Sequence, residues 1–175
     1  AEVEAPAIIV NIPEFRLRTL SGDPSDELTM RVVVGKAAGH KTPVFEGDLK
    51  HVVFRPYWNV PPSILRHELL PRLETDPSYA KREDMEVVST GRDSWAGSAI
   101  DGAMLAALRS GEARLRQRPG PRNALGGIKF VLPNTMEVYL HGTPARELFE
   151  RTRRDFSHGC IRVRDPDALA AFVLQ

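Results

Sequence analysis

The residues best suited to covalent chemistry lie near the C-terminal end of the sequence, where Cys160, the single cysteine, follows a His-Gly pair. A thiol attacks carbonyl carbons as its thiolate, and an adjacent imidazole can take the proton or hold it in an ion pair. His141 is the expected base, with His158 as the alternative. A lone cysteine is often only a small buried residue, so this chemistry depends on what the fold places beside it.

Strand parity predicts that the reactive groups share one surface, because side chains alternate between the two faces of a strand. The segment Met136–His141 reads as a strand whose apolar residues, from Met136 onward, face the core. The segment Cys160–Arg164 reads the same way, with Ile161 and Val163 facing inward. If the two strands lie in one sheet, its open surface carries Tyr139, His141, Cys160 and Arg162.

Two neighbours of the cysteine add to this prediction. Gly159 can adopt backbone angles forbidden to other residues, so the amides around Gly159 and Cys160 could turn toward a developing oxyanion. Arg162 could lower the thiol pKa or bind a substrate carboxylate, because a guanidinium keeps its charge and forks onto carboxylates. Taken alone, an arginine or a histidine is usually a solvated surface group, so the inference rests on the combination.

A zinc site is the alternative use of the same residue types. His141, His158 and Cys160 are permissible ligands, and an open fourth position would make a hydrolase. Neither a second cysteine nor a helix with two histidines four residues apart accompanies them. The residue types therefore favour a cysteine mechanism without metal or organic cofactor.

The elements that must position these groups read as short antiparallel strands. Residues 7–54 contain alternating and β-branched runs separated by turn sequences such as Ser21–Pro24 and Glu46–Asp48. After a Gly- and Pro-rich loop over residues 119–127, a strand is expected at Ile128–Leu132, and a turn at Pro133–Thr135 leads into the next strand. The fold class expected from these runs is mainly β, with hairpin connections.

A helical insertion interrupts the strands. Pro71 should break one helix and Gly111 should end another, and the expected helices span Ile64–Leu70, Pro77–Met85 and Ile100–Arg109. An insertion of this length is usually functional, so residues 58–118 are expected to form a capping subdomain, or lid, over the site. The alternative is a decorative subdomain.

Composition limits the partners. The 175 residues suit one domain, 42% of them are hydrophobic, and a net charge of +1 gives no overall attraction for nucleic acid. No apolar run approaches the roughly 20 residues that span a bilayer. The chain opens at Ala1 without a leader sequence, which does not decide its compartment.

Two sets of residues resemble a known family. His141-Gly142-Thr143-Pro144, followed by Ser157-His158-Gly159-Cys160-Ile161-Arg162-Val163, resembles the signature of the YkuD-type L,D-transpeptidases. The runs Phe54–Ile64 and Pro119–Gly126 resemble its larger YcbB-type branch, whose catalytic domain carries a capping insertion. The likeness covers nearly the whole chain, and the catalytic domain is expected to span residues 1–175.

The resemblance implies a mainly β, sandwich-type catalytic domain and assigns roles to ten residues. Cys160 would be the nucleophile and His141 the base, with the Gly142 carbonyl orienting the imidazole. Amides of His158, Gly159 and Cys160 would bind the oxyanion. Substrate binding is expected from Tyr139, Arg162, Ser157, Trp58 and Asn134. The family domain usually continues beyond a helix near Pro166, so part of it is expected to be missing.

The implied activity is cross-linking between diaminopimelate residues of peptidoglycan tetrapeptide stems, donor and acceptor, outside the cytoplasmic membrane in the periplasm or cell envelope. Carbapenems are expected inhibitors, and a monomer is expected. Hydrolysis of the same thioester would make an L,D-carboxypeptidase or a cysteine amidase instead. A different class, a non-catalytic wall-binding module, would use the six basic residues between Arg109 and Lys129.

Overall fold

The chain divides into two units in the computed structural model, which describes residues 4–89 and 100–175. Unit 1 comprises residues 1–55 and 125–175, and unit 2 comprises residues 56–124. Residues 90–99 of the predicted lid lie outside the described residues. Each unit has its own buried apolar cluster, so each is described by itself.

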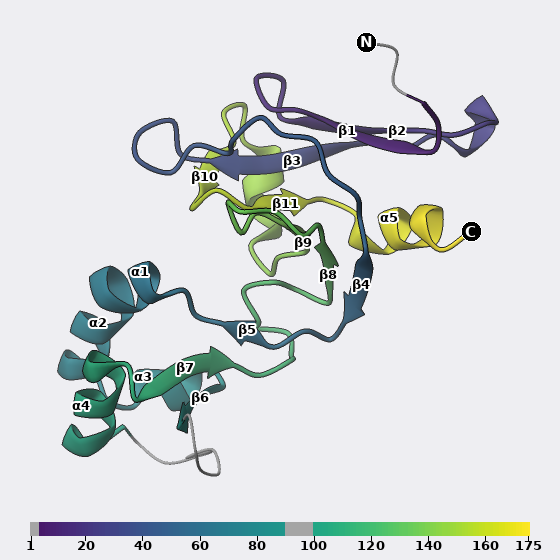
Figure 1. The fold of residues 1–175 in the computed structure, drawn as a ribbon. Coiled ribbons are helices and arrows are strands. Elements are labelled where there is room, and N and C mark those ends of the chain that lie inside the picture. The colour runs from purple at the N-terminus through teal and green to yellow at the C-terminus, as the bar shows by residue number, and fades with distance from the viewer. Residues whose placement is uncertain (1–3, 90–99) are drawn as a thin grey trace. The chain divides into compact units, whose positions relative to one another are not determined.

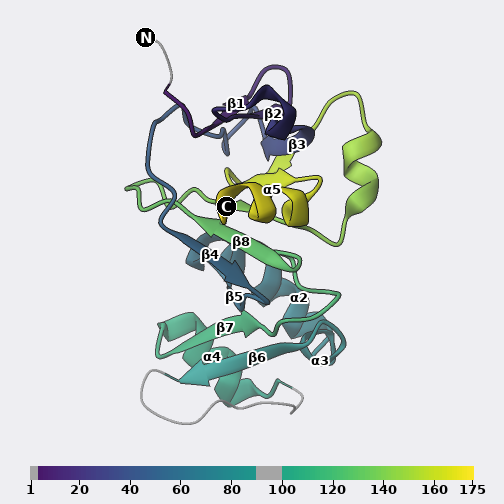
Figure 2. The same ribbon diagram turned by 90° about the vertical axis from the view of Figure 1, so that its right-hand side faces the viewer.

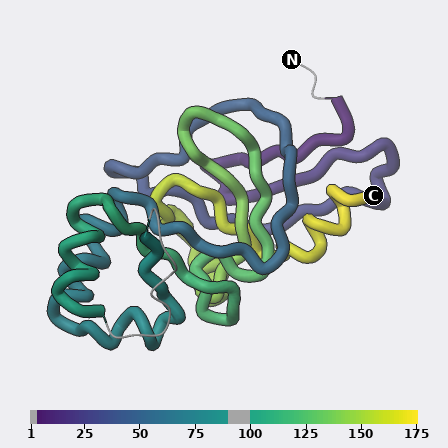
Figure 3. The backbone as a smooth tube through the Cα atoms, turned by 60° about the horizontal axis from the view of Figure 1, so that its bottom comes forward, coloured from purple at the N-terminus to yellow at the C-terminus, as the bar shows by residue number. Residues whose placement is uncertain are grey.

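Unit 1 is built on one curled sheet, in the order β1-β2-β3-β11-β9-β8-β4, with β10 pairing to β3 (Figure 1). The irregular residues 36–50 connect β3 to β4 and form the blue arc in Figure 3. The strands are β1 (Ala7–Asn11), β2 (Arg16–Leu20), β3 (Thr29–Gly35), β4 (His51–Phe54), β8 (Ile128–Val131), β9 (Leu140–His141), β10 (Asp155–Ser157) and β11 (Ile161–Val163). This agrees with the mainly β fold class expected from the sequence.

The core of unit 1 lies on one face of this sheet. Val32 and Val34 of β3 face the same side as the apolar positions of β11, and Val32 and Val163 are fully buried there. Helix α5 (Pro166–Val173) adds Leu169 and Ala170 to that core. Asp165 caps the helix by accepting the Ala168 N–H at 3.0 Å. The short helices η1 (Pro24–Asp26) and η3 (Arg146–Glu150) complete the unit.

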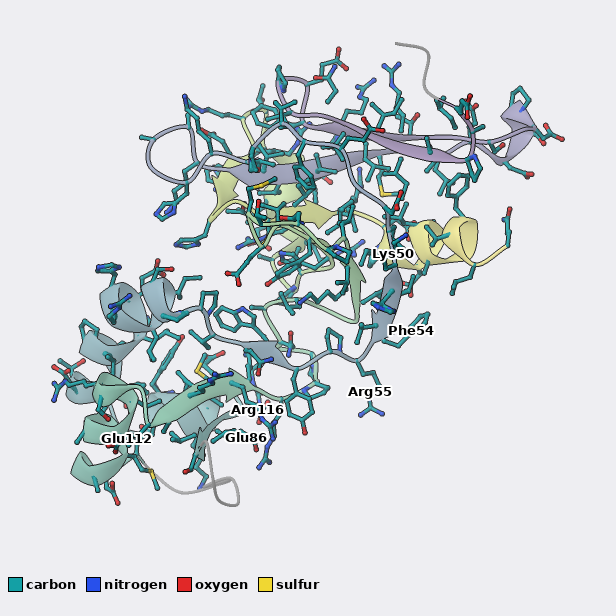
Figure 4. All side chains as sticks on the ribbon, viewed as in Figure 1. Lys50, Phe54, Arg55, Glu86, Glu112 and Arg116 are labelled. Carbon is teal, nitrogen blue, oxygen red and sulfur yellow. The ribbon has the colours of Figure 1, made fainter. Side chains whose placement is uncertain are left out.

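Unit 2 places helices against a three-stranded sheet of order β5-β7-β6 (Figure 2). Glu86 of β6 is buried, and its carboxylate accepts the Nε donors of Arg116 and Arg118, the first of which lies beside it in Figure 4. The strands are β5 (Trp58–Asn59), β6 (Met85–Ser89) and β7 (Ala113–Gln117), and the helices are α1 (Pro62–Ile64), η2 (Leu65–Leu69), α2 (Leu70–Thr75), α3 (Tyr79–Arg82) and α4 (Gly102–Ser110).

The helices of unit 2 depart from the expected ones in two ways. Pro71 does not break its helix, because the preceding turn η2 widens to a π-helix in which the Leu70 N–H reaches the Leu65 carbonyl. The chain then stays helical to Thr75. Met85 lies in β6, so the insertion contains a three-stranded sheet beside its helices and is not purely helical. Helix α4 ends as predicted at Gly111, whose φ is +82°.

One strand of unit 1 is also shorter than predicted. Residues 136–139 are not strand, and Met136 is exposed instead of facing the core. The physical reason is the Asn134 side chain, whose Oδ1 accepts the N–H groups of Met136 and Val138, both at 3.1 Å, and holds the chain in a turn. Glu137 has a φ of +55° within that turn. Strand geometry resumes only at Leu140.

Candidate active site

The predicted nucleophile, Cys160, comes just before strand β11 of unit 1, and the predicted base, His141, lies on the neighbouring strand β9. Strand β11 runs parallel to β9, with Arg162 in register with His141, and antiparallel to β3 on its other side. The adjacency inferred from parity is therefore present. Cys160 immediately precedes β11 and is half-buried, and its thiol donates to the Glu137 carbonyl over 3.8 Å.

The surroundings of Cys160 act on its pKa in opposite directions. Burial raises the pKa of the thiol above its ordinary value, which is the largest effect. Hydrogen bonds from Tyr139 and the positive charges of Lys129 and Arg162 lower it in part. The resting group is therefore a neutral thiol beside partners that favour the thiolate, so it needs a base to become a nucleophile at neutral pH.

His141 is the predicted base, and its imidazole is held in one orientation by a backbone carbonyl. Its Nδ1 lies 2.5 Å from the Gly142 carbonyl oxygen, which can only accept, so Nδ1 carries the hydrogen and Nε2 is left as a proton acceptor. His141 is 5% exposed, so the expectation that it lies on an open surface of the sheet is wrong. Burial first, and then the charges of Arg162 and Lys129, lower the pKa of His141 to about 3. The imidazole is consequently neutral across the physiological pH range.

The carbonyl that orients the imidazole depends on a glycine that sequence analysis placed only in a loop. Gly126 has a φ of +64°, and a Cβ there would lie 2.6 Å from the Thr143 nitrogen and 2.8 Å from the Gly142 carbonyl carbon. The backbone of Gly142 can therefore approach only a glycine. The Gly142 N–H also donates to the Ile128 carbonyl at 2.9 Å, which fixes the same peptide from the other side.

The turn before the nucleophile is closed by Ser157. Its hydroxyl donates to the Cys160 carbonyl at 2.5 Å and accepts the Gly159 N–H at 3.1 Å. Ser157 is buried, so the structure gives it a role in shaping the turn, while its predicted role in substrate binding stays a prediction. The Gly159 N–H is engaged in this turn and not directed at an oxyanion. Gly159 has a φ of +122°, which favours glycine there.

Thr42, which sequence analysis did not single out, holds the same turn from the opposite side. Its buried hydroxyl donates to the Gly159 carbonyl at 2.7 Å and accepts the Gly35 N–H at 2.8 Å. A Cβ on Gly35 would lie 1.9 Å from the His40 carbonyl oxygen and 3.0 Å from the Gly159 Cα, so this crossing needs glycine. Nothing in the local sequence signals Thr42, because its partners come from distant strands.

Removing the Thr42 hydroxyl should therefore slow acylation of the nucleophile. In Thr42→Val, the Gly35 N–H and the Gly159 carbonyl lose their partner, at a cost of about 1–3 kcal/mol per buried group. Displacement of the turn should lower the acylation rate of Cys160 about tenfold to a hundredfold, with substrate KM little changed. Stopped-flow acylation by a carbapenem measures this, and Thr42→Ser, which keeps the hydroxyl, should react at close to the parental rate. Parental rates in Thr42→Val would remove Thr42 from the site.

Three polar side chains surround the Cys160–His141 pair. The Tyr139 ring lies 5.6 Å from the His141 ring, and Lys129 Nζ lies 3.8 Å above the Tyr139 ring. Lys129 is in register with His141 on β8 and was missed by sequence analysis. Polar and apolar residues alternate along the strand of Lys129, and that strand was expected to pair with the next one. These two features could have placed Lys129 near His141. Within the described part of the chain, the buried Arg162 Nε has no hydrogen-bond partner.

The remaining predicted site residues lie in other surroundings. The His158 ring contacts the His40 ring edge-on, with centroids 4.8 Å apart. The amide of Asn134 donates to the carbonyls of Leu132 and Val138 and is used within its own loop. Trp58 lies on β5 of unit 2, partly buried against that unit's core. Substrate binding by Asn134 and Trp58 stays a prediction.

In residues 4–89 and 100–175, no group of three or more His, Cys, Asp or Glu side chains is placed to hold a metal ion. None of the helices in that part of the chain has the length and apolar character needed to cross a bilayer.

Comparison with known proteins connects this site to a family. A sequence model of the YkuD family, described as the L,D-transpeptidase catalytic domain, matches residues 5–175. A Haemophilus influenzae protein with the name "Putative L,D-transpeptidase" is 35% identical over 171 residues, which are 96% of this chain and 33% of that protein. The chain thus spans about a third of the length of this curated relative.

Proposed function

The chain belongs to the YkuD family of L,D-transpeptidase catalytic domains, and from this premise we propose that it joins peptidoglycan stem peptides through a thioester on Cys160. The observation that carries the proposal is the pairing of β9 with β11, which brings Cys160 beside the strand of His141. The Nε2 atom of His141 is unprotonated, because Nδ1 carries the hydrogen. The links formed are those between diaminopimelate residues. No metal or organic cofactor takes part.

The first half-reaction forms the thioester. His141 Nε2 takes the thiol proton, and Cys160 Sγ attacks the carbonyl carbon that joins diaminopimelate to the terminal D-alanine of the donor stem. The tetrahedral oxyanion is stabilised by the Cys160 amide. The peptide C–N bond then breaks, His141 returns the proton to the leaving amine, and D-alanine departs.

The second half-reaction passes the acyl group to an amine. The side-chain amine of an acceptor stem attacks the thioester carbonyl, and His141 takes a proton from the attacking nitrogen. The C–S bond breaks, and the thiolate regains the proton from the imidazolium. Lys129, Arg162 and Tyr139 favour the thiolate as leaving group, as they favour it in the first step. The Arg162 guanidinium suits a carboxylate of the stem.

Product analysis tests this proposal. Purified disaccharide tetrapeptides are incubated with the protein, and the products are separated by liquid chromatography and identified by mass spectrometry. A dimer that has lost one D-alanine is the expected product. Tripeptide monomer as the sole product would assign the chain to the L,D-carboxypeptidases instead.

The family acts on the cell wall, and we propose an extracytoplasmic, periplasmic place of action for this chain. Carbapenems should acylate Cys160, because their strained carbonyl needs only the thiolate and the oxyanion donor. The protein is proposed to act as a monomer, since all the residues named for the two half-reactions come from unit 1 of one chain.

Unit 2 is proposed to bind the stem peptide, with Trp58 as one contact. Replacing residues 56–124 by a short glycine-serine linker should slow cross-linking about a hundredfold or more, because productive geometry depends on contacts distant from the reacting carbonyl. Carbapenem acylation should persist. The design is feasible because the Arg55 N–H donates to the Gly127 carbonyl at 2.8 Å, so the two cut ends already lie together. Leu125 and Gly126 are kept, since Gly126 supports Gly142.

Circular dichroism first establishes that the shortened protein is folded, and then both reactions are timed on the same sample. A Trp58→Ala variant of the full chain is the matched control. Its cross-linking rate should fall in part, while its rate of carbapenem acylation should not change. Cross-linking at the parental rate in the shortened protein would show that unit 2 is dispensable. Loss of both reactions in a folded sample would show that it shapes the nucleophile itself.

A further inference from the structure

Three arginines lie opposite one another across three adjacent strands of unit 1. Arg16 of β2 is the register partner of Arg31 of β3. The Arg164 N–H donates to the Arg31 carbonyl at 3.1 Å, which extends the β3–β11 pairing by one residue and sets Arg164 opposite Arg31. Like charges at directly opposed positions destabilise a sheet. This row therefore has an electrostatic cost that an anion would remove.

A cavity lies at this row. Its volume is about 480 Å³, and it is open to solvent on the surface of unit 1. Helix η3 contributes a fourth guanidinium from Arg146, and the start of α5 contributes one carboxylate and one small side chain. The residues that define its chemistry are Arg16, Arg31, Arg146, Arg164, Asp165 and Ala168.

The positive charges in this cavity exceed the negative ones. Arg31 and Arg164 share a single carboxylate, Glu150, at 2.8 and 3.2 Å. In the described part of the chain, Arg16 and Arg146 form no ion pair. The Asp165 carboxylate already caps α5. Four guanidinium groups against two carboxylates leave an excess of two positive charges.

A fifth arginine, Arg154, adds positive charge beside this row. Among residues 4–89 and 100–175, the Arg154 guanidinium donates to the backbone carbonyls of Phe15, Val32 and Arg151 and forms no ion pair. Burial and the charges of Arg31 and Arg16 lower its pKa, so the positive potential of the row extends to this neighbour.

We propose that this cavity binds a phosphate group, free or as a monoester. A phosphate dianion matches the excess of two charges, and its tetrahedral oxygens can accept from guanidinium groups on different strands, whereas one carboxylate is satisfied by one guanidinium fork. Arg164 follows Cys160 by four residues, about 13 Å along an extended chain. The site is therefore separate from the nucleophile and does not depend on the proposed transpeptidation.

The experiment measures thermal unfolding of the full chain at pH 8 while sodium phosphate or glycerol 3-phosphate replaces sodium chloride at constant ionic strength. The parental protein should show a saturable rise in its unfolding midpoint. Arg16→Gln and Arg146→Gln should weaken the apparent affinity about tenfold or more, because each removes a charge-assisted donor. Both side chains are exposed, so these variants should fold. A larger response to the ester than to inorganic phosphate would extend the site to the organic part of the ligand.

Arg18→Gln is the matched control. Arg18 lies on the same strand and carries the same charge, yet it pairs with Glu14 and does not line the cavity. Its phosphate response should equal the parental one. Without phosphate and at low salt, Arg16→Gln should unfold at a higher temperature than the parent, because the opposed charges are relieved.

An undiminished phosphate response in both Arg16→Gln and Arg146→Gln would overturn the proposal. A parental response no larger than that to chloride would do the same. Loss of the response in Arg162→Gln alone would place the phosphate beside Cys160 and also contradict it.

Discussion

Replacing Cys160 with alanine should abolish cross-linking, lowering the rate by at least about a thousandfold, and should prevent any acyl adduct. The sequence holds no other thiol that could take over, and the polar groups around Cys160 activate or stabilise a thiolate without being nucleophiles themselves at neutral pH. Cross-linked dimer is measured by chromatography after incubation with disaccharide tetrapeptides. The half-buried side chain is small, so the variant should fold, which circular dichroism checks.

The same assay distinguishes the thioester mechanism from a zinc hydrolase mechanism. Exhaustive chelation should leave the parental rate unchanged, whereas a loss of activity that zinc restores would favour the metal mechanism. Turnover retained by Cys160→Ala at more than a trace would end the thioester mechanism.

The second large effect is expected at His141. Changing it to alanine should slow acylation at pH 7 by about a hundredfold to ten-thousandfold, because burial raises the pKa of the Cys160 thiol and leaves little thiolate without a base. The rate of alkylation by iodoacetamide, measured across pH, should then rise only with spontaneous ionisation of the thiol at alkaline pH. A profile unchanged from the parent would assign activation elsewhere, with His158 the first candidate. His158→Ala is therefore measured in parallel.

His141 should also leave a signature in stability. Its pKa is about 3 in the folded protein against an ordinary value of 6.5, so the unfolded chain binds more protons between these two values. Stability should therefore rise with pH across that window and be lost as the pH falls through it. Urea unfolding of the parent and of His141→Gln should differ in slope there, the variant being less sensitive to pH. Equal slopes would show that the pKa of His141 is the same in the folded and unfolded states.

Much of the site follows from strand parity. Val138, Leu140, Ile161 and Val163 all lie in the core of unit 1, as alternation predicted, and this alone orients Cys160 and Arg162 away from that core. Strand alternation predicted the wrong orientation for Met136, because the side-chain amide of Asn134 holds the backbone there in a turn. Such a local hydrogen bond competes with the backbone hydrogen bonds between strands, and it produces no periodic pattern in the sequence.

The residues that sequence analysis missed depend on long-range contacts. Thr42 lies in an irregular segment, and its partners Gly35 and Gly159 are brought to it only by the pairing of β3 with β11. Gly126 owes its importance to the close approach of Gly142. The β sheet of unit 2 was detectable in part, because residues 113–117 alternate in polarity, but the basic character of the run favoured a surface interpretation.

The most direct test of the central claim is intact-protein mass spectrometry after brief incubation with purified tetrapeptide stems whose acceptor amine is blocked. Without an acceptor, the thioester should accumulate. The expected result is a mass increase equal to the stem without its terminal D-alanine, release of D-alanine in equal amount, and a peptide map that assigns the adduct to Cys160. Turnover of the stems with an unmodified Cys160, or an adduct on any other residue, would contradict it.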